Sequence, residues 1–221
     1  FVIKRYWIFI FLLLMCIVMS NYNILQRTIS KTVSFSGIGL HSGNICNITL
    51  KPSEADTGII FIRKDLKENN VIPADFRYIY KSNLCTTLKA YNSDAKILTV
   101  EHLLASIKGN SIDNLIIEVD SQEIPILDGS ARGFDDIIKS AGTTEHINKF
   151  KKYLFINKKV TVKNENSVFT LEPFNELKIN CTVNFPEPIG KQTVSIGNNY
   201  EEIYKEVMDA KTFCFYEDIE I

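Results

Sequence analysis

Hydrophobic and polar residues alternate along the early part of the chain with a period of two, which predicts strands. Ile29, Val33 and Phe35 alternate with polar positions from Thr28 to Phe35, and the pattern ends at Gly37-Ile38-Gly39. Two further strands are predicted from Asn44 to Leu50 and from Gly58 to Ile62, separated by a loop at residues 52–56. The opening of the chain therefore predicts an antiparallel sheet.

A helical pattern begins near Thr99. Leu103, Leu104 and Ile107 provide one apolar side, and Gly109-Asn110 ends the run. Thr99 can cap this helix with Glu101 close behind it, an arrangement similar to a capping box. The pattern places Glu101 and His102 in the first helical turn.

The rest of the chain repeats the order of strands followed by a helix. A β-rich run from Ile112 to Val119 predicts a central strand, and an extended segment leads through Asp128-Gly129-Ser130 into a turn. We expect a helix from about Ala131 to Ser140. After it, we expect strands at residues 153–162, 168–171 and 177–185 and a helix at 200–208.

The predicted fold class is α+β, with two similar sheet-plus-helix domains in tandem. Residues 23–141 form the first domain in this interpretation. The polar segment 142–152 is an interdomain linker. Residues 153–221 form a second domain that is incomplete in this chain, and residues 1–22 are an apolar extension outside the fold.

The apolar extension has two interpretations. Trp7 to Met19 is an unbroken apolar run after Lys4-Arg5, shorter than the roughly 20 residues that cross a bilayer and similar to the apolar region of a signal peptide. It could then anchor the chain through residues 4–19. Alternatively, translation starts at Met19 and residues 1–18 are upstream codons read in frame. The abrupt end at residues 217–221 leads us to expect a C-terminally truncated chain.

Composition narrows the class of protein. The 221 residues are 45% hydrophobic and 23% charged, with a formal net charge of -1, which is typical of a globular protein and gives no basic field for nucleic acid. Five cysteines are scattered without a Cys-x-x-Cys pair. Neither a disulfide framework nor a cysteine zinc site is indicated, and reduced thiols fit a cytoplasmic protein.

Glu101-His102 is the candidate catalytic pair. A neutral imidazole can hold a divalent metal while a neighbouring carboxylate accepts a proton from water, which is hydrolase chemistry. Each residue also has a structural interpretation, since His102 can be a hydrogen-bonded residue near the core and Glu101 a helix-capping partner. The same dipeptide at Glu145-His146 lies in a polar segment, so a Glu-His pair alone decides nothing.

Several segments together resemble one enzyme family, UDP-3-O-acyl-N-acetylglucosamine deacetylase, the zinc amidase of lipid A synthesis. The segments that carry the resemblance, in order, are Ser36-Gly37-Ile38-Gly39-Leu40-His41-Ser42-Gly43, Asn83-Leu84-Cys85-Thr86-Thr87, Thr99-Val100-Glu101-His102-Leu103-Leu104-Ala105, Ile112-Asp113-Asn114, Glu123-Ile124-Pro125-Ile126-Leu127-Asp128-Gly129-Ser130-Ala131 and Ala210-Lys211-Thr212-Phe213-Cys214-Phe215. The resemblance covers about residue 23 to residue 221.

The resemblance implies a role for each matching residue. His102 would be one zinc ligand, Glu101 the general base, and Thr212 the donor that stabilises the oxyanion. Leu84, Cys85 and Phe213 would line the route for the sugar and acyl chain, and His41 would bind substrate close to the site. An apolar core and a turn would also explain these residues. Asp128-Gly129-Ser130 is interpreted as a structural turn. The implied partner is UDP-3-O-acyl-N-acetylglucosamine and the implied cofactor is Zn²⁺. Membrane contact would be peripheral at most, or through residues 4–19.

Two features depart from the family. Lys211 and Cys214 stand where the family usually has arginine and glycine, which changes the surroundings of Thr212. The family also takes two zinc ligands from a later His-x-x-x-Asp segment and its general acid from a still later histidine. We therefore expect these 221 residues alone to hold zinc weakly and to be inactive. A degenerate, membrane-anchored remnant and an unrelated α+β domain are the alternatives.

Overall fold

The computed structural model describes residues 24–80, 84–153, 155–175, 178–187, 189–197 and 200–212. Its strands are β1 (Leu25–Ile29), β2 (Val33–Ile38), β3 (Ile45–Lys51), β4 (Ile59–Arg63), β5 (Val71–Pro73), β6 (Ile79–Tyr80), β7 (Thr87–Lys89), β8 (Lys96–Ile97), β9 (Leu115–Val119), β10 (Thr143–Phe150), β11 (Val160–Lys163), β12 (Val168–Leu171), β13 (Lys178–Asn184) and β14 (Lys191–Gly197). Its helices are η2 (Phe76–Tyr78), α2 (Glu101–Gly109), α3 (Arg132–Ala141) and α4 (Tyr200–Met208). This mixture confirms the α+β fold class.

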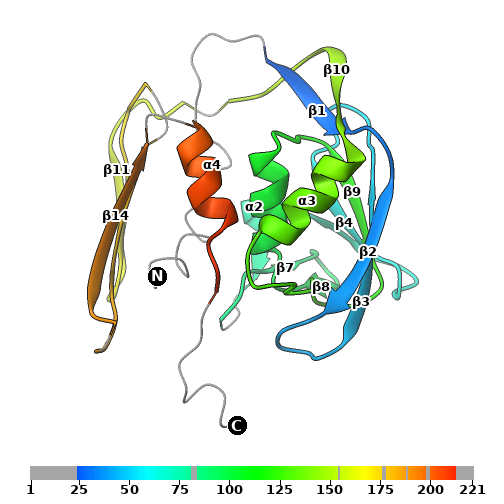
Figure 1. Cartoon of the computed structure of the whole chain (residues 1–221), viewed down its shortest axis with the longest axis horizontal. Coiled ribbons are helices and arrows are strands. Elements are labelled where there is room, and N and C mark those ends of the chain that lie inside the picture. The colour runs from blue at the N-terminus through cyan, green and yellow to red at the C-terminus, as the bar shows by residue number, and fades with distance from the viewer. Residues whose placement is uncertain are drawn as a thin grey trace.

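A five-stranded sheet in the order β2-β3-β9-β4-β5 forms the largest layer. All its neighbouring pairs are antiparallel except β4 and β9, which run parallel. The helices α2 and α3 lie beside this sheet, as Figure 1 shows. The main core lies between them and contains fully buried side chains such as Phe61, Leu103, Leu115 and Phe134.

Side-chain spacing explains which faces are buried. In α3, Phe134, Ile138 and Ala141 recur at helical spacing and are buried, while the opposite face carries charges. In β13, Ile179, Cys181 and Val183 are buried and alternate with exposed polar residues. A helix and a strand of this kind each present one apolar side to a neighbour.

A second, smaller core joins the later part of the chain to α2. The helix α4 contacts both α2 and β14, so it lies between α2 and the β13–β14 hairpin (Figure 1). Ala105 of α2 and Ala131 at the start of α3 pack with Ile179, Val207 and Met208. Helices therefore lie between two layers of strands, and α2 packs against residues from both halves of the chain.

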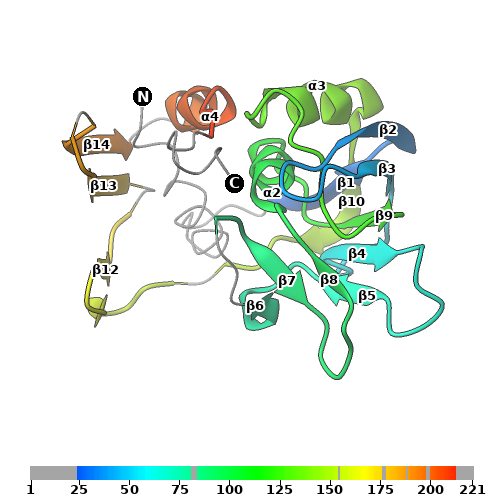
Figure 2. The same ribbon diagram turned by 90° about the horizontal axis from the view of Figure 1, so that it is seen from below.

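A three-stranded sheet, β6-β7-β8, projects beside β4 and β5, as seen in Figure 2. It was not predicted from the sequence because its strands are only two or three residues long. Runs of that length show no alternation that could be distinguished from a loop. This small sheet leads directly into α2.

The segment 142–152 differs from its prediction as a linker, because residues 143–150 form β10, which pairs antiparallel with β1. Most of its side chains are exposed, so the strand shows no apolar alternation. The predicted strand from Thr28 to Phe35 is likewise two strands, β1 and β2, separated at residues 30–32. The division of the chain into two domains stays a prediction.

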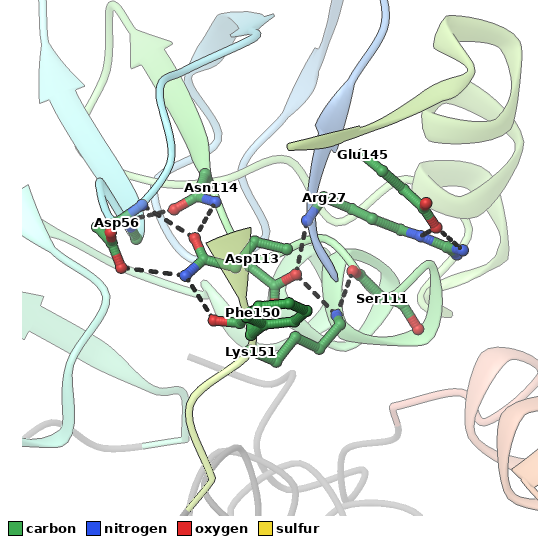
Figure 3. A network of polar contacts seen from close by, with 10 residues as sticks. Arg27, Asp56, Ser111, Asp113, Asn114, Glu145, Phe150 and Lys151 are labelled. Atoms are coloured by element: carbon green, nitrogen blue, oxygen red, sulfur yellow. Dashed lines mark hydrogen bonds and ion pairs between the residues drawn. The ribbon is translucent and has the colours of Figure 1, made fainter. Parts of the chain in front are cut away.

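Polar contacts hold β1 and the end of β10 against the residues that directly precede β9 (Figure 3). Asp113 accepts hydrogen bonds from the backbone N–H of Arg27 at 2.8 Å and from Lys151 Nζ at 2.7 Å. Asn114 is buried, accepts from the N–H of Gly58 at 3.0 Å and donates to Gln26 Oε1 at 2.9 Å. The Ile112-Asp113-Asn114 motif thus has a structural purpose in this fold.

No helix in the described part of the chain is both long and apolar enough to cross a bilayer. The apolar segment at residues 1–22 lies outside the described residues.

Candidate active site

The helix α2 begins at Glu101 without the predicted capping box. Val100 occupies the N-cap position, and no side chain caps the helix there. Thr99 instead has a left-handed backbone with φ of 59°, and its hydroxyl donates to Glu123 Oε1 at 3.0 Å. The prediction was wrong because a buried carboxylate from another segment binds the hydroxyl that would have capped the helix.

Glu101 is buried in the first turn of α2, as predicted, with 8% of its surface exposed. Its Oε2 accepts a hydrogen bond from the backbone N–H of Thr86 at 2.9 Å. Burial raises the pKa of the Glu101 carboxyl to about 7, because removal from water disfavours the charged form more than the hydrogen bonds from the Glu101 backbone and from Thr86 favour it. A carboxyl group with a pKa near neutrality suits a general base.

His102 follows in the same turn and is 3% exposed. Burial lowers the pKa of its imidazole to about 4, and the nearby negative charge of Asp128 opposes this only in part. Among the described residues, none forms a hydrogen bond with its ring. A neutral imidazole with an uncommitted lone pair fits the zinc ligand that the resemblance implies.

One imidazole is one ligand of a metal site. Across the described ranges, no group of three or more His, Cys, Asp or Glu side chains is arranged to hold a metal ion. A catalytic zinc site typically has three protein ligands and an open position. His102 can therefore supply one position of such a site.

Thr212 comes from the far end of the chain to the Asp128-Gly129-Ser130 turn. Its backbone N–H donates to the carbonyl oxygen of Gly129 at 2.9 Å, and Lys211 Nζ lies 3.2 Å from Asp128 Oδ2. Asp128 accepts from the N–H and hydroxyl of Ser130 at 3.1 and 2.7 Å, which confirms the predicted structural turn. The negative charge of Asp128 is close enough to His102 to favour its protonated form, so the turn brings Thr212 toward the start of α2.

The remaining predicted residues are held by neighbouring segments. The backbone N–H of His41 donates to Glu123 Oε1 at 2.9 Å, while its side chain is exposed. Leu84 is 57% exposed and has a left-handed backbone with φ of 64°. Cys85 is buried, with its thiol 3.6 Å from Thr87 Oγ1. Phe213 lies outside the described residues.

Thr86 and Glu123 also hold the site together, and the sequence patterns predicted a role for neither. Thr86 binds Glu101 through its backbone, which no side-chain pattern reveals. Glu123 is completely buried. Its signals in the sequence are its place in a segment that carries the family resemblance and its position directly before the apolar run from Ile124 to Leu127.

The family model described as UDP-3-O-acyl N-acetylglycosamine deacetylase (LpxC) matches residues 26–221. The chain belongs to this deacetylase family. The match spans all the segments that suggested the resemblance. It includes both the start of α2 and the segment that carries Thr212.

Individual members of the deacetylase family agree with this assignment. The proteins named UDP-3-O-acyl-N-acetylglucosamine deacetylase from Idiomarina loihiensis and from Legionella pneumophila strain Corby are each 42% identical to the chain over 198 residues, which is 88% of this chain and 64% of theirs. The Myxococcus xanthus protein of that name is 39% identical over 202 residues, 91% of this chain and 63% of its own length. The chain thus spans slightly less than two thirds of these deacetylases.

Proposed function

We propose that the chain carries the general base and one metal ligand of a zinc-dependent enzyme that hydrolyses the N-acetyl amide of UDP-3-O-acyl-N-acetylglucosamine. The reaction releases acetate and is a step of lipid A biosynthesis. The observation that carries this proposal is the buried Glu101-His102 pair at the start of α2, in a chain that is 42% identical to a protein named as this deacetylase.

The chemistry follows from the three side chains. His102 would hold the zinc ion, which when bound polarises the amide carbonyl and makes a nearby water more acidic. Glu101, with a pKa of about 7, accepts a proton from the water that attacks the carbonyl carbon. Thr212 donates a hydrogen bond to the oxygen that becomes negatively charged. The C–N bond then breaks as the glucosamine nitrogen takes up a proton from the general acid, which the resemblance assigns to a later histidine, and the products are acetate and the free amine of glucosamine.

The substrate would extend past the residues that surround Glu101 and His102. His41, Leu84, Cys85 and Phe213 are proposed to line the route for the sugar and the acyl chain. The support is positional, since Leu84 and Cys85 directly precede the residue that binds Glu101, and the His41 turn is linked to Thr99 through one carboxylate.

We propose a cytoplasmic location, which agrees with cysteines scattered along the chain. We also propose that a chain of these 221 residues holds zinc weakly and turns over little substrate. The resemblance assigns only one zinc ligand, His102, to this chain, and catalytic sites typically need three.

The test measures acetate release from UDP-3-O-acyl-N-acetylglucosamine, with and without a chelator, by the protein as its gene encodes it and by the 221-residue chain. Activity should require zinc. Glu101→Gln should reduce kcat by about a hundredfold to ten-thousandfold, the usual contribution of a general base. The matched control is Glu145→Gln, which alters the exposed carboxylate of the second Glu-His pair, on β10.

Two outcomes would overturn the proposal. One is that the Glu101→Gln variant releases acetate as fast as the Glu145→Gln variant does. The other is activity that survives complete removal of zinc. Turnover by the 221-residue chain at the rate of the whole gene product would contradict only the part that concerns the isolated chain.

A further inference from the structure

Glu123 is a carboxylate in the interior of the protein, with no exposed surface. Its backbone is held next to residue 98, where an isolated parallel bridge joins Leu98 and Glu123. The N–H of Leu98 donates to the carbonyl oxygen of Gln122 at 2.9 Å, and the N–H of Ile124 donates back to that of Leu98 at 3.0 Å. The side chain therefore starts from a fixed position close to the beginning of α2.

Both oxygens of this carboxylate bind the turn between β2 and β3. Oε1 accepts from the N–H of His41 at 2.9 Å, and Oε2 accepts from the N–H of Ser42 at 2.7 Å. Gly39 leaves room for it, because a Cβ at that position would lie 2.6 Å from Oε2. Two successive amides that donate to one charged group hold a turn more firmly than neutral hydrogen bonds do.

The same carboxylate also binds Thr99, two residues before Glu101. Oε1 also accepts from the Thr99 hydroxyl at 3.0 Å. A β-branched residue with a φ of 59° is strained and persists only where its surroundings hold it. The hydroxyl bond supplies such a restraint directly before the catalytic pair.

We propose that Glu123 is a positioning residue that couples the His41 turn to the start of α2. One carboxylate sets the backbone of both segments, so that His41 approaches the site together with Glu101 and His102. The catalytic consequence rests on the proposed deacetylase function, whereas the coupling itself is a property of the chain.

The coupling is tested by amide hydrogen exchange on the 221-residue chain. Glu123→Gln should speed exchange at the amides of His41 and Ser42 by about tenfold or more, because a charged acceptor becomes neutral. Thr99→Val removes only the hydroxyl at the α2 side, and it should still speed exchange at these two amides. Thr99→Ser should restore the slow rates. The matched control is Glu118→Gln on β9, whose carboxylate pairs with Lys51.

The catalytic consequence is tested by steady-state kinetics of the protein as its gene encodes it. Thr99→Val should lower kcat by about tenfold while KM changes less than twofold, and Thr99→Ser should recover kcat. Glu123→Gln should affect both constants because it also releases the His41 turn. Glu118→Gln should match the unchanged protein.

The outcomes separate the two levels of the proposal. Unchanged exchange at the His41 and Ser42 amides in Thr99→Val would overturn the coupling. Faster exchange with unchanged kcat in both Thr99→Val and Glu123→Gln would overturn the positioning role. If the unsubstituted protein releases no acetate, the proposed function fails, and exchange still decides whether Glu123 couples the two segments.

Discussion

Glu101 and His102 should make opposite contributions to the pH dependence of stability. The Glu101 pKa is raised from 4.5 to about 7, so its protonated form is favoured in the folded state, and this stabilisation is lost as pH rises through 7. The His102 pKa is lowered from 6.5 to about 4, so its stabilisation is complete above 6.5 and is lost as pH falls through 4. Both effects arise from burial.

The size of each effect follows from the shifts. A group that is protonated in only one state changes the free energy of unfolding by about 1.4 kcal/mol per pH unit. Between pH 4.5 and 6.5 the folded chain keeps the Glu101 proton and excludes the His102 proton, so the two slopes cancel. Glu101→Gln should remove the falling contribution, and its stability relative to the unsubstituted chain should rise by about 3 kcal/mol across this window. His102→Gln should show a decrease of similar size.

The assay is urea unfolding followed by circular dichroism, at pH values from 4 to 8 with a chelator present. Each variant is compared with the unsubstituted chain at the same pH, so that other titrating groups contribute equally to both. Ser106→Ala, a substitution on the same helix that removes no titrating group, should give a difference that is constant with pH. A flat difference for Glu101→Gln, or slopes of the same sign for both variants, would refute the argument from burial.

Three other substitutions test the packing around the site by the same unfolding assay. Ser106→Ala should leave stability unchanged or raise it by up to about 1 kcal/mol, because the Ser106 hydroxyl is buried without a hydrogen-bond partner among the described residues. A loss of stability would show that the hydroxyl has a partner. Asn114→Ala should cost about 2–4 kcal/mol, since it leaves the N–H of Gly58 without its acceptor and removes the hydrogen bond to Gln26 Oε1. Phe134→Ala should cost about 3–5 kcal/mol through a cavity in the main core, and a loss below 1 kcal/mol would contradict the observed packing.

Local patterns predicted the elements whose side chains face one apolar neighbour. Val168–Leu171 forms a strand with the predicted bounds, and the predicted helices near residues 101, 132 and 200 are present. The local patterns failed where the structure depends on partners that are distant in the sequence. The strand β10 has mostly exposed side chains, and it is a strand because its backbone pairs with β1, which lies more than a hundred residues earlier.

The candidate site shows the same division. The helical pattern was sufficient to place Glu101 and His102 in the first turn of α2, where the structure has them. The conformation of Thr99 could not be predicted, because it depends on Glu123, which is 24 positions away in the sequence. Capping propensity is a local quantity, and here a buried carboxylate from another segment outweighs it.

Glu101 and Glu123 show how one fold gives two buried carboxylates different properties. At Glu101, burial outweighs the hydrogen bonds from its own backbone and from Thr86, so its pKa rises to about 7. Burial would also raise the pKa of Glu123, but donors from Ser42, His41 and Thr99 outweigh it and lower the pKa below its ordinary value. The charge retained on Glu123 in turn contributes to the raised pKa of Glu101. When neighbouring carboxylates have pKa values pushed apart in this way, the raised one is suited to exchange protons and the lowered one to hold structure. The balance between burial and hydrogen-bond donors at each carboxylate therefore supports Glu101 as the base and Glu123 as the group that positions the site.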